Sequence, residues 1–84
     1  MYEVRITPEG FRHLNRIPPK VREAALHGPI SESPRQLGNA LVGDLAGLRS
    51  ARRGDYWIIY GLDDTIRTVT VHRIQHRGSV YRPR

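Results

Sequence analysis

The sequence predicts a single α+β domain: a twisted, mainly antiparallel four-stranded sheet with two helices packed on one face. Three observations predict it. Apolar segments of strand length, alternating or continuous, occur near both ends of the chain. The segment at the start is followed by apolar residues at a helical period, and the segments near the end are separated by turn residues. The resulting order β-α-α-β-β-β is that of an α+β domain, which should span residues 1–84.

The first strand and the first helix are predicted at the start of the chain. Residues 2–6 alternate in polarity, which is the period of a half-buried strand. Thr7 suits a helix N-cap, and Pro8 supplies the φ angle of a first helical residue. Apolar side chains then recur at every third position, at Phe11, Leu14 and Ile17. These side chains should form the buried edge of the helix.

A second helix should begin at Pro18-Pro19 and end before Gly28-Pro29. Its inner face would carry Val21, Ala24 and Ala25. The chain is then rich in glycine, proline, serine and asparagine as far as Gly43, so we expect residues 31–39 to be mostly loop.

Three further strands should complete the sheet, over residues 45–53, 56–62 and 67–75, with an acidic turn at Asp63-Asp64 joining the last two. In the central strand, alternation separates two sets of side chains. We expect the first set to face the helices: Tyr56, Ile58, Tyr60 and Leu62. The second set should lie on the open face: Trp57, Ile59 and Gly61.

The composition favours a basic protein that binds nucleic acid. The net charge is +6, and five of these six charges belong to residues 49–84, which hold eight basic and three acidic residues. Thirteen of the fourteen basic residues are arginine, whose planar fork pairs with phosphate and stacks on bases. GC-rich coding would produce the same preference for arginine. With no cysteine, no apolar run of about 20 residues and no signal-peptide pattern, a cytoplasmic location away from membranes fits best.

The candidate RNA-binding residues lie on the last three predicted strands and beyond them: Arg49, Arg53, Trp57, Arg73 and Arg82. Alternation should send Arg49 and Arg53 to one face and Arg52 to the other. Such arginines also suit a solvated sheet edge that resists aggregation. On the open face, Trp57 could stack on a base, which is worth about 1 to 3 kcal/mol, although a single tryptophan also suits a core or a protein interface.

The candidate catalytic residues are Arg52, His76, Arg77 and Tyr81. Cleavage of RNA by its own 2′-hydroxyl needs a base, positive charge on the phosphorane and an acid for the leaving 5′ oxygen. A histidine, a fixed cation and a phenol close together in sequence supply these groups, although ordinary surface residues at a strand end would look the same. The spacing of the four histidines matches no zinc motif, and we expect neither a metal nor another cofactor.

Several short segments together resemble the RelE/ParE superfamily of bacterial toxins. They are Val4 to Ile6, Leu14 with Pro18-Pro19, Ser33-Pro34 before Leu37-Gly38, Leu45-x-x-Leu48, Gly54-Asp55-Tyr56, Ile59-Tyr60, Asp63-Asp64, Val69-x-Val71, His76-Arg77 and Val80-Tyr81. The resemblance implies a toxin of a type II toxin–antitoxin pair. In its RelE-like branch, the toxin cleaves mRNA in the ribosomal A site without a metal. It also implies a RelB-like antitoxin as partner, and operator DNA bound through the antitoxin complex.

The resemblance also implies roles for single residues. Arg52 matches a basic position that the family carries on the strand before Gly-Asp-Tyr. Arg77 matches a basic position of the family's terminal strand, and Tyr81 matches the C-terminal tyrosine of its catalytic set. The chain departs from the nuclease branch at four positions that often carry cations there: Leu48, Ser50, Trp57 and Gln75. The ParE-like branch, which inhibits DNA gyrase, and a weakened toxin that mainly binds antitoxin or DNA therefore remain alternatives.

Overall fold

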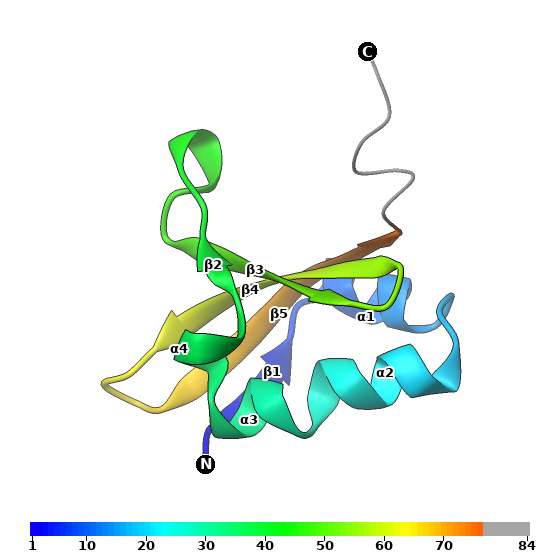
Figure 1. Cartoon of the computed structure of the whole chain (residues 1–84), viewed down its shortest axis with the longest axis horizontal. Coiled ribbons are helices and arrows are strands. Elements are labelled where there is room, and N and C mark those ends of the chain that lie inside the picture. Colours follow the sequence, from blue (N-terminus) through cyan, green and yellow to red (C-terminus); the bar gives the residue numbers. More distant parts are fainter. Residues whose placement is uncertain (77–84) are drawn as a thin grey trace.

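Five strands form one mixed sheet in the order β1-β5-β4-β3-β2 in this computed structural model, which describes residues 1–76 (Figure 1). They are β1 (Glu3–Ile6), β2 (Asn39–Ala40), β3 (Leu48–Arg53), β4 (Tyr56–Asp63) and β5 (Thr68–His76). Only the β1–β5 pair is parallel among them. The predicted fold class is confirmed, with one additional strand. β2 has only two residues, too few to give an alternating pattern.

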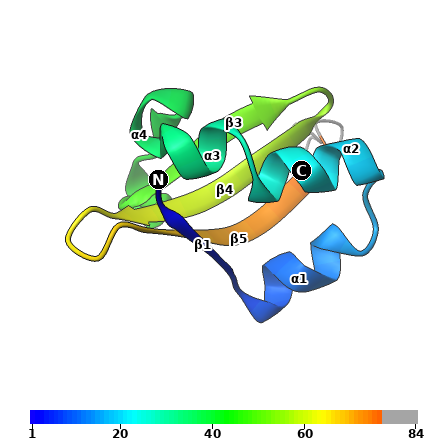
Figure 2. The ribbon, with the colours of Figure 1, turned by 90° about the horizontal axis from the view of Figure 1, so that it is seen from below.

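The helices lie on one face of this sheet, as Figure 2 shows for α1, α2 and α3. Their bounds are α1 (Pro8–Leu14), α2 (Pro19–Leu26), α3 (Pro29–Glu32) and α4 (Pro34–Leu37), and a 3₁₀ turn, η1 (Gly43–Leu45), follows β2. The prediction that residues 31–39 are mostly loop is wrong, because the end of α3 and the whole of α4 are helical there. Contacts distant in sequence stabilise α4: the buried Tyr60 hydroxyl donates to the Pro34 carbonyl at 2.6 Å.

Helix α1 begins as the sequence predicts but turns a different edge inward. The Thr7 hydroxyl accepts the Gly10 N–H at 3.0 Å, which confirms the N-cap. Leu14 and Ile17 are buried, whereas Phe11 is 57% exposed, so its assignment to the buried edge is wrong. Gly10 occupies the inward position instead, so close to β5 that a Cβ atom there would lie 2.7 Å from the Val71 carbonyl oxygen. His13 is also turned inward, where its Nδ1 accepts the Ile74 N–H at 3.1 Å.

The alternation predicted for β4 is confirmed. Ile58 and Tyr60 are fully buried under the helices, against Val69 and Val71 of β5. The ladder between β4 and β5 is interrupted once, because Ile59 pairs with Arg73 and the next residue of β4 pairs with Val71. The extra residue in β5 is a β-bulge, which bends the strand. None of the helices within residues 1–76 has the length and apolar character needed to cross a membrane.

Candidate nucleic-acid interface

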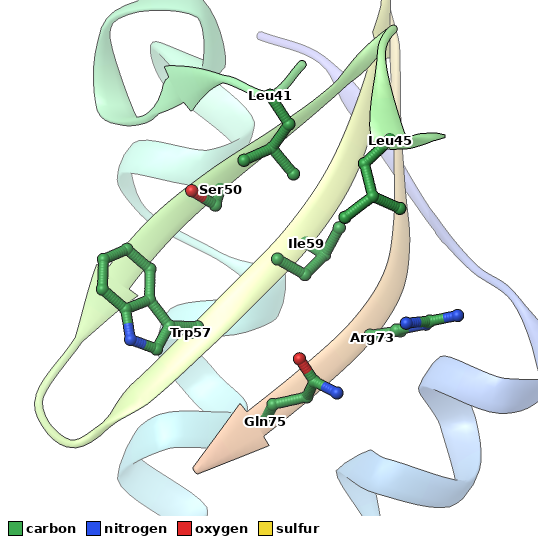
Figure 3. Close-up of a pocket in the computed structure, with 7 residues that line it drawn as sticks. All are labelled: Leu41, Leu45, Ser50, Trp57, Ile59, Arg73 and Gln75. Atoms are coloured by element: carbon green, nitrogen blue, oxygen red, sulfur yellow. The ribbon is translucent and has the colours of Figure 1, made fainter. Parts of the chain in front are cut away.

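The face of the sheet opposite the helices carries a shallow cavity of ≈ 230 Å³ (Figure 3). Its lining comes from β3, β4, β5 and the connection after β2: Leu41, Leu45, Ser50, Trp57, Ile59, Arg73 and Gln75. Figure 3 shows the leucines and Ile59 gathered over the sheet, with Arg73 and Gln75 along β5. The cavity therefore combines an apolar floor with polar groups on one side. We call this surface the open face.

Trp57 lies on the open face, as the alternation of β4 predicts, and its side chain is half-buried. Its partner in the β3–β4 ladder is Arg52. Residues paired across two strands direct their side chains to the same face. The structure thus places a flat aromatic side chain and a cation next to each other at one end of the cavity.

Arg52 is exposed, and only one of its groups has a partner within residues 1–76: the Nε–H donates to the Gly54 carbonyl at 3.1 Å. This bond fixes the side chain near the β3–β4 turn and leaves both terminal amino groups for an anion. Arg73, by contrast, lies 3.4 Å from Glu9 of α1 (Nε to Oε2), with both side chains about half exposed. The carboxylate partly offsets the positive charge of Arg73.

Arg49 and Arg53 lie on the helix side of β3, where they pair with Tyr60 and Tyr56 in the ladder. The terminal nitrogen of Arg49 donates to the carbonyls of Arg35 at 2.6 Å and Gly38 at 2.8 Å. Arg49 therefore holds the end of α4 against the sheet. The two arginines share a face that is not the one of Trp57, so a single flat contact with RNA cannot use all the arginines of β3.

His76 also faces the helix side. Its ring packs edge-on against Tyr56, with ring centroids 5.2 Å apart and an interplanar angle of 84°. Two of the predicted catalytic residues, Arg52 and His76, consequently lie on opposite faces of the sheet. Arg77, Tyr81 and Arg82 lie outside the described residues. No group of three His, Asp or Glu side chains among residues 1–76 is placed as metal ligands would be.

Sequence reasoning missed the two leucines of the cavity. Leu41 belongs to a stretch that the glycine and proline content marks only as a connection. Leu45 is the first residue of the strand predicted over residues 45–53, but the structure places it in the 3₁₀ turn η1 and begins β3 at Leu48. The remaining signal in the sequence is the apolar pair Leu41-Val42 between Ala40 and Gly43, and this pair does not show against which face of the sheet it packs. Tertiary folding of β2 and η1 back over β3 brings both leucines to Ile59.

The chain resembles known toxins over nearly its whole length, although it matches no family model. It is 42% identical to toxin RelE of Mycobacterium tuberculosis, in an alignment covering 96% of this chain and 87% of the relative. It is 39% identical to toxin RelG of the same organism, in an alignment covering 96% of this chain and 97% of the relative.

Solved structures agree in fold. The crystal structure of the toxin–antitoxin complex RelBE2 from M. tuberculosis superposes with a TM-score of 0.82 and 39% identity, covering 90% of this chain and 91% of the other. The isolated RelE toxin of E. coli gives a TM-score of 0.71 at 19% identity, covering 90% of this chain and 84% of the other. That second likeness concerns the fold alone.

Proposed function

Because this chain belongs to the RelE family of toxins, we propose that it is a ribosome-dependent endoribonuclease that cleaves mRNA and so inhibits translation. The observation that carries this proposal is the pair Arg52 and Trp57 on the open face. An exposed guanidinium can bind a phosphate while the indole ring beside it stacks on a base. The apolar cavity next to the pair offers room for part of a nucleotide.

In the proposed mechanism, Arg52 and Arg77 stabilise the negative charge of the phosphorane. Arginine keeps its proton in proteins, so neither residue can act as the base. Tyr81 or His76 would exchange protons with the 2′ and 5′ oxygens. A phosphate held by Arg52 would lie across the sheet from His76, and this geometry makes Tyr81 the first candidate.

We further propose that a RelB-like antitoxin neutralises the protein, since the related structure with 39% identity is a toxin–antitoxin complex. The antitoxin would cover part of the basic surface, and operator DNA would be bound through the complex. The ribosomal A site would hold the mRNA for cleavage. Few protonatable groups are present on the open face, so the ribosome would supply the alignment that the toxin alone lacks.

A second candidate function is inhibition of DNA gyrase, as in the ParE-like branch. It is favoured by one observation: Leu48, Ser50 and Gln75 are uncharged at positions on the open side where nucleases often carry cations. The cleavage site would then hold fewer charges than a fast nuclease needs. The same observation would fit a weakened toxin that mainly binds antitoxin or DNA.

Primer extension on mRNA from cells that express the toxin separates the two functions. Cuts at a fixed position within codons would support the ribosome-dependent nuclease. Intact mRNA together with induction of the SOS response would instead support the gyrase inhibitor. Intact mRNA with normal growth would contradict both, and would indicate a chain that acts only through binding.

A further inference from the structure

Two arginines lie at opposite corners of the open face. Arg52 of β3 pairs with Trp57 of β4, and Arg73 of β5 pairs with Ile59 of β4. Because Trp57 and Ile59 are next to each other on one face of β4, the arginines belong to neighbouring rows of side chains on the two strands that flank β4. A strand spacing of about 4.8 Å and a rise of about 3.4 Å per residue separate their Cα atoms by about 12 Å. The indole ring and the apolar floor of the cavity lie between the two cations.

The guanidinium of Arg73 is turned out of the cavity. Figure 3 shows its side chain extending along the sheet, away from Ile59 and Leu45. Its Nε lies 3.4 Å from Oε2 of Glu9, and the two side chains are 44% and 45% exposed. The carboxylate of Glu9 therefore holds the guanidinium at the rim of the open face, where solvent reaches both groups.

Helix α1 fixes Glu9 beside β5. Before Glu9, the Thr7 hydroxyl donates to the His72 carbonyl at 3.2 Å. After Glu9, Nδ1 of His13 accepts the Ile74 N–H at 3.1 Å. Because α1 is bonded to β5 on both sides of Glu9, the carboxylate stays within reach of the strand that carries the arginine.

Exchange of the Glu9 carboxylate for a phosphate would cost little. An exposed ion pair contributes little free energy, since water and salt screen it. The arginine side chain has several rotatable bonds, so its guanidinium can move from Glu9 to the cavity while β5 stays in place. A phosphate can accept two parallel hydrogen bonds from a guanidinium, which makes it a stronger partner than a carboxylate held near Nε alone.

A nucleotide bound in the cavity would carry a phosphate on each side. With its base on Trp57 and one phosphate at Arg52, as in the proposed function, the RNA chain would continue over Ile59 toward β5. The neighbouring phosphate would then come within reach of Arg73, at the opposite corner of the open face. Arg73 is thereby suited to hold the RNA, whereas Arg52 acts on the phosphate that reacts.

We propose that Arg73 binds the phosphate next to the scissile one, and that Glu9 is a positioning residue that keeps the Arg73 guanidinium outside the cavity until RNA replaces it. This inference rests on the proposed function, because RNA is the ligand. A contact away from the reacting atoms stabilises the ground state and the transition state equally. Loss of Arg73 should therefore raise KM with little change in kcat, and loss of the Glu9 charge should lower KM.

Binding of an RNA that cannot be cleaved tests the phosphate contact directly. A short single-stranded RNA with 2′-O-methyl groups lacks the attacking hydroxyl, and the fluorescence of Trp57, the single tryptophan of the chain, reports its binding. Arg73→Ala should weaken binding about tenfold, the effect of losing one charge-assisted hydrogen bond. It should also reduce the steepness of log affinity against log salt by about 0.7, the value for one phosphate of a single strand. An unchanged affinity and an unchanged salt dependence would overturn the proposal.

Glu9→Gln keeps the length of the side chain and removes its charge. Released from the ion pair, Arg73 should bind phosphate more readily, and the affinity for RNA should rise about twofold to fivefold. Glu9→Gln combined with Arg73→Ala separates this effect from direct repulsion of RNA by the carboxylate. The double variant should bind RNA as weakly as Arg73→Ala alone. A gain that persists without Arg73, or the absence of any gain in its presence, would refute the role of Glu9.

Glu3 offers a matched control for the loss of one negative charge. Its Oε2 lies 3.2 Å from Nε of Arg5, in another exposed ion pair. Glu3 pairs with Thr68 of β5, about 15 Å along the strand from Arg73, and salt at 0.1 M screens charges beyond about 10 Å. Glu3→Gln should therefore leave the affinity for RNA unchanged. A gain equal to that of Glu9→Gln would show general electrostatic attraction and contradict a specific exchange.

Cleavage of mRNA on ribosomes by the same variants gives a second readout. Arg73→Ala should raise KM about tenfold and change kcat by no more than about twofold. A fall in kcat at unchanged KM would make Arg73 part of the chemistry and would overturn its role in binding. Circular dichroism checks folding, and Arg73→Gln, which also removes the charge, replaces the alanine variant if that variant does not fold.

The two assays distinguish failure of this inference from failure of the proposed function. If mRNA stays intact while the 2′-O-methyl RNA binds with the expected dependence on Arg73 and Glu9, the nuclease is contradicted and the exchange at Arg73 is supported. If mRNA is cut on ribosomes but neither residue affects KM or RNA affinity, the nuclease is supported and the exchange is contradicted. Absence of any RNA binding by the wild-type protein would also overturn the exchange.

Discussion

Arg52 of β3 and Trp57 of β4 lie directly opposite each other in the sheet, with both side chains on the open face. A cation that binds phosphate therefore stands next to an aromatic ring that can stack on a base. The β3–β4 turn between them is short, and the Arg52 Nε–H bond to the Gly54 carbonyl ties the side chain to that turn. Two predictions depend on this pair.

Replacing Trp57 with alanine should lower cleavage about tenfold to a hundredfold, because one lost stacking contact costs about 1 to 3 kcal/mol. Trp57→Phe should keep most of the activity, since it keeps an aromatic ring. Ribosome-dependent cleavage of a defined mRNA measures both, with circular dichroism as the check on folding. Full activity of a folded Trp57→Ala variant would contradict a stacking role.

Arg52 and Arg53 are neighbours on opposite faces and form a matched pair for mutation. Arg52→Ala should lower the cleavage rate about a hundredfold, the usual cost of removing one group that stabilises transition-state charge. Arg53→Ala should change the rate by no more than about twofold. Both variants remove one positive charge, so equal losses would indicate general electrostatic attraction and not a specific phosphate contact.

Much of this architecture follows from local signals in the sequence. Alternation in β4 and the Thr7-Pro8 helix start depend on neighbouring residues, and both are confirmed. The inward edge of α1 could not be predicted in the same way. Phe11 is the larger apolar residue, but close approach of the helix to β5 admits only Gly10 at the contact. The helical turn α4 depends on distant groups, among them Arg49 and Tyr60. The Ser31 carbonyl of α3 likewise accepts the N–H of a distant residue, Tyr2.

The candidate site was predictable only in part, for the same reason. The alternation of side chains along a strand predicts on which face of the sheet Trp57 lies. That Arg52 and His76 lie on opposite faces depends instead on how β3 and β5 align across β4. The bulge in β5 could not be foreseen from alternation. The two leucines of the cavity come from a connection whose path is set by tertiary packing.

The hydroxyl of Tyr60 should contribute to stability through its buried bond to the Pro34 carbonyl. Tyr60→Phe removes the donor and leaves that carbonyl unpaired, so the free energy of unfolding should fall by about 1 to 3 kcal/mol. Tyr56→Phe, on the same strand and face, is the control and should cost less than about 0.5 kcal/mol. Urea unfolding of the two variants measures the difference, and equal stabilities would contradict a role for the bond in holding α4.

Gly10 should be intolerant of alanine although it lies within a helix. In an exposed helix, alanine would add about 1 kcal/mol of stability relative to glycine. Here the new Cβ would lie 2.7 Å from the Val71 carbonyl, so we expect a loss of about 1 to 3 kcal/mol in unfolding free energy. At Gly61 the nearest atom would be 3.5 Å away, and Gly61→Ala should be tolerated. A stabilised Gly10→Ala variant would show that α1 can move away from β5 at little cost.

The most direct test of the proposed function compares cleavage of one mRNA by the purified toxin with and without ribosomes. The mRNA should be positioned with a defined codon in the A site. The account predicts cleavage at that codon on ribosomes, little or no cleavage of the free mRNA, and loss of the ribosomal cut with Arg52→Ala. Equally fast cleavage of free mRNA would contradict the dependence on the ribosome, and an mRNA left intact in both reactions would contradict the nuclease itself.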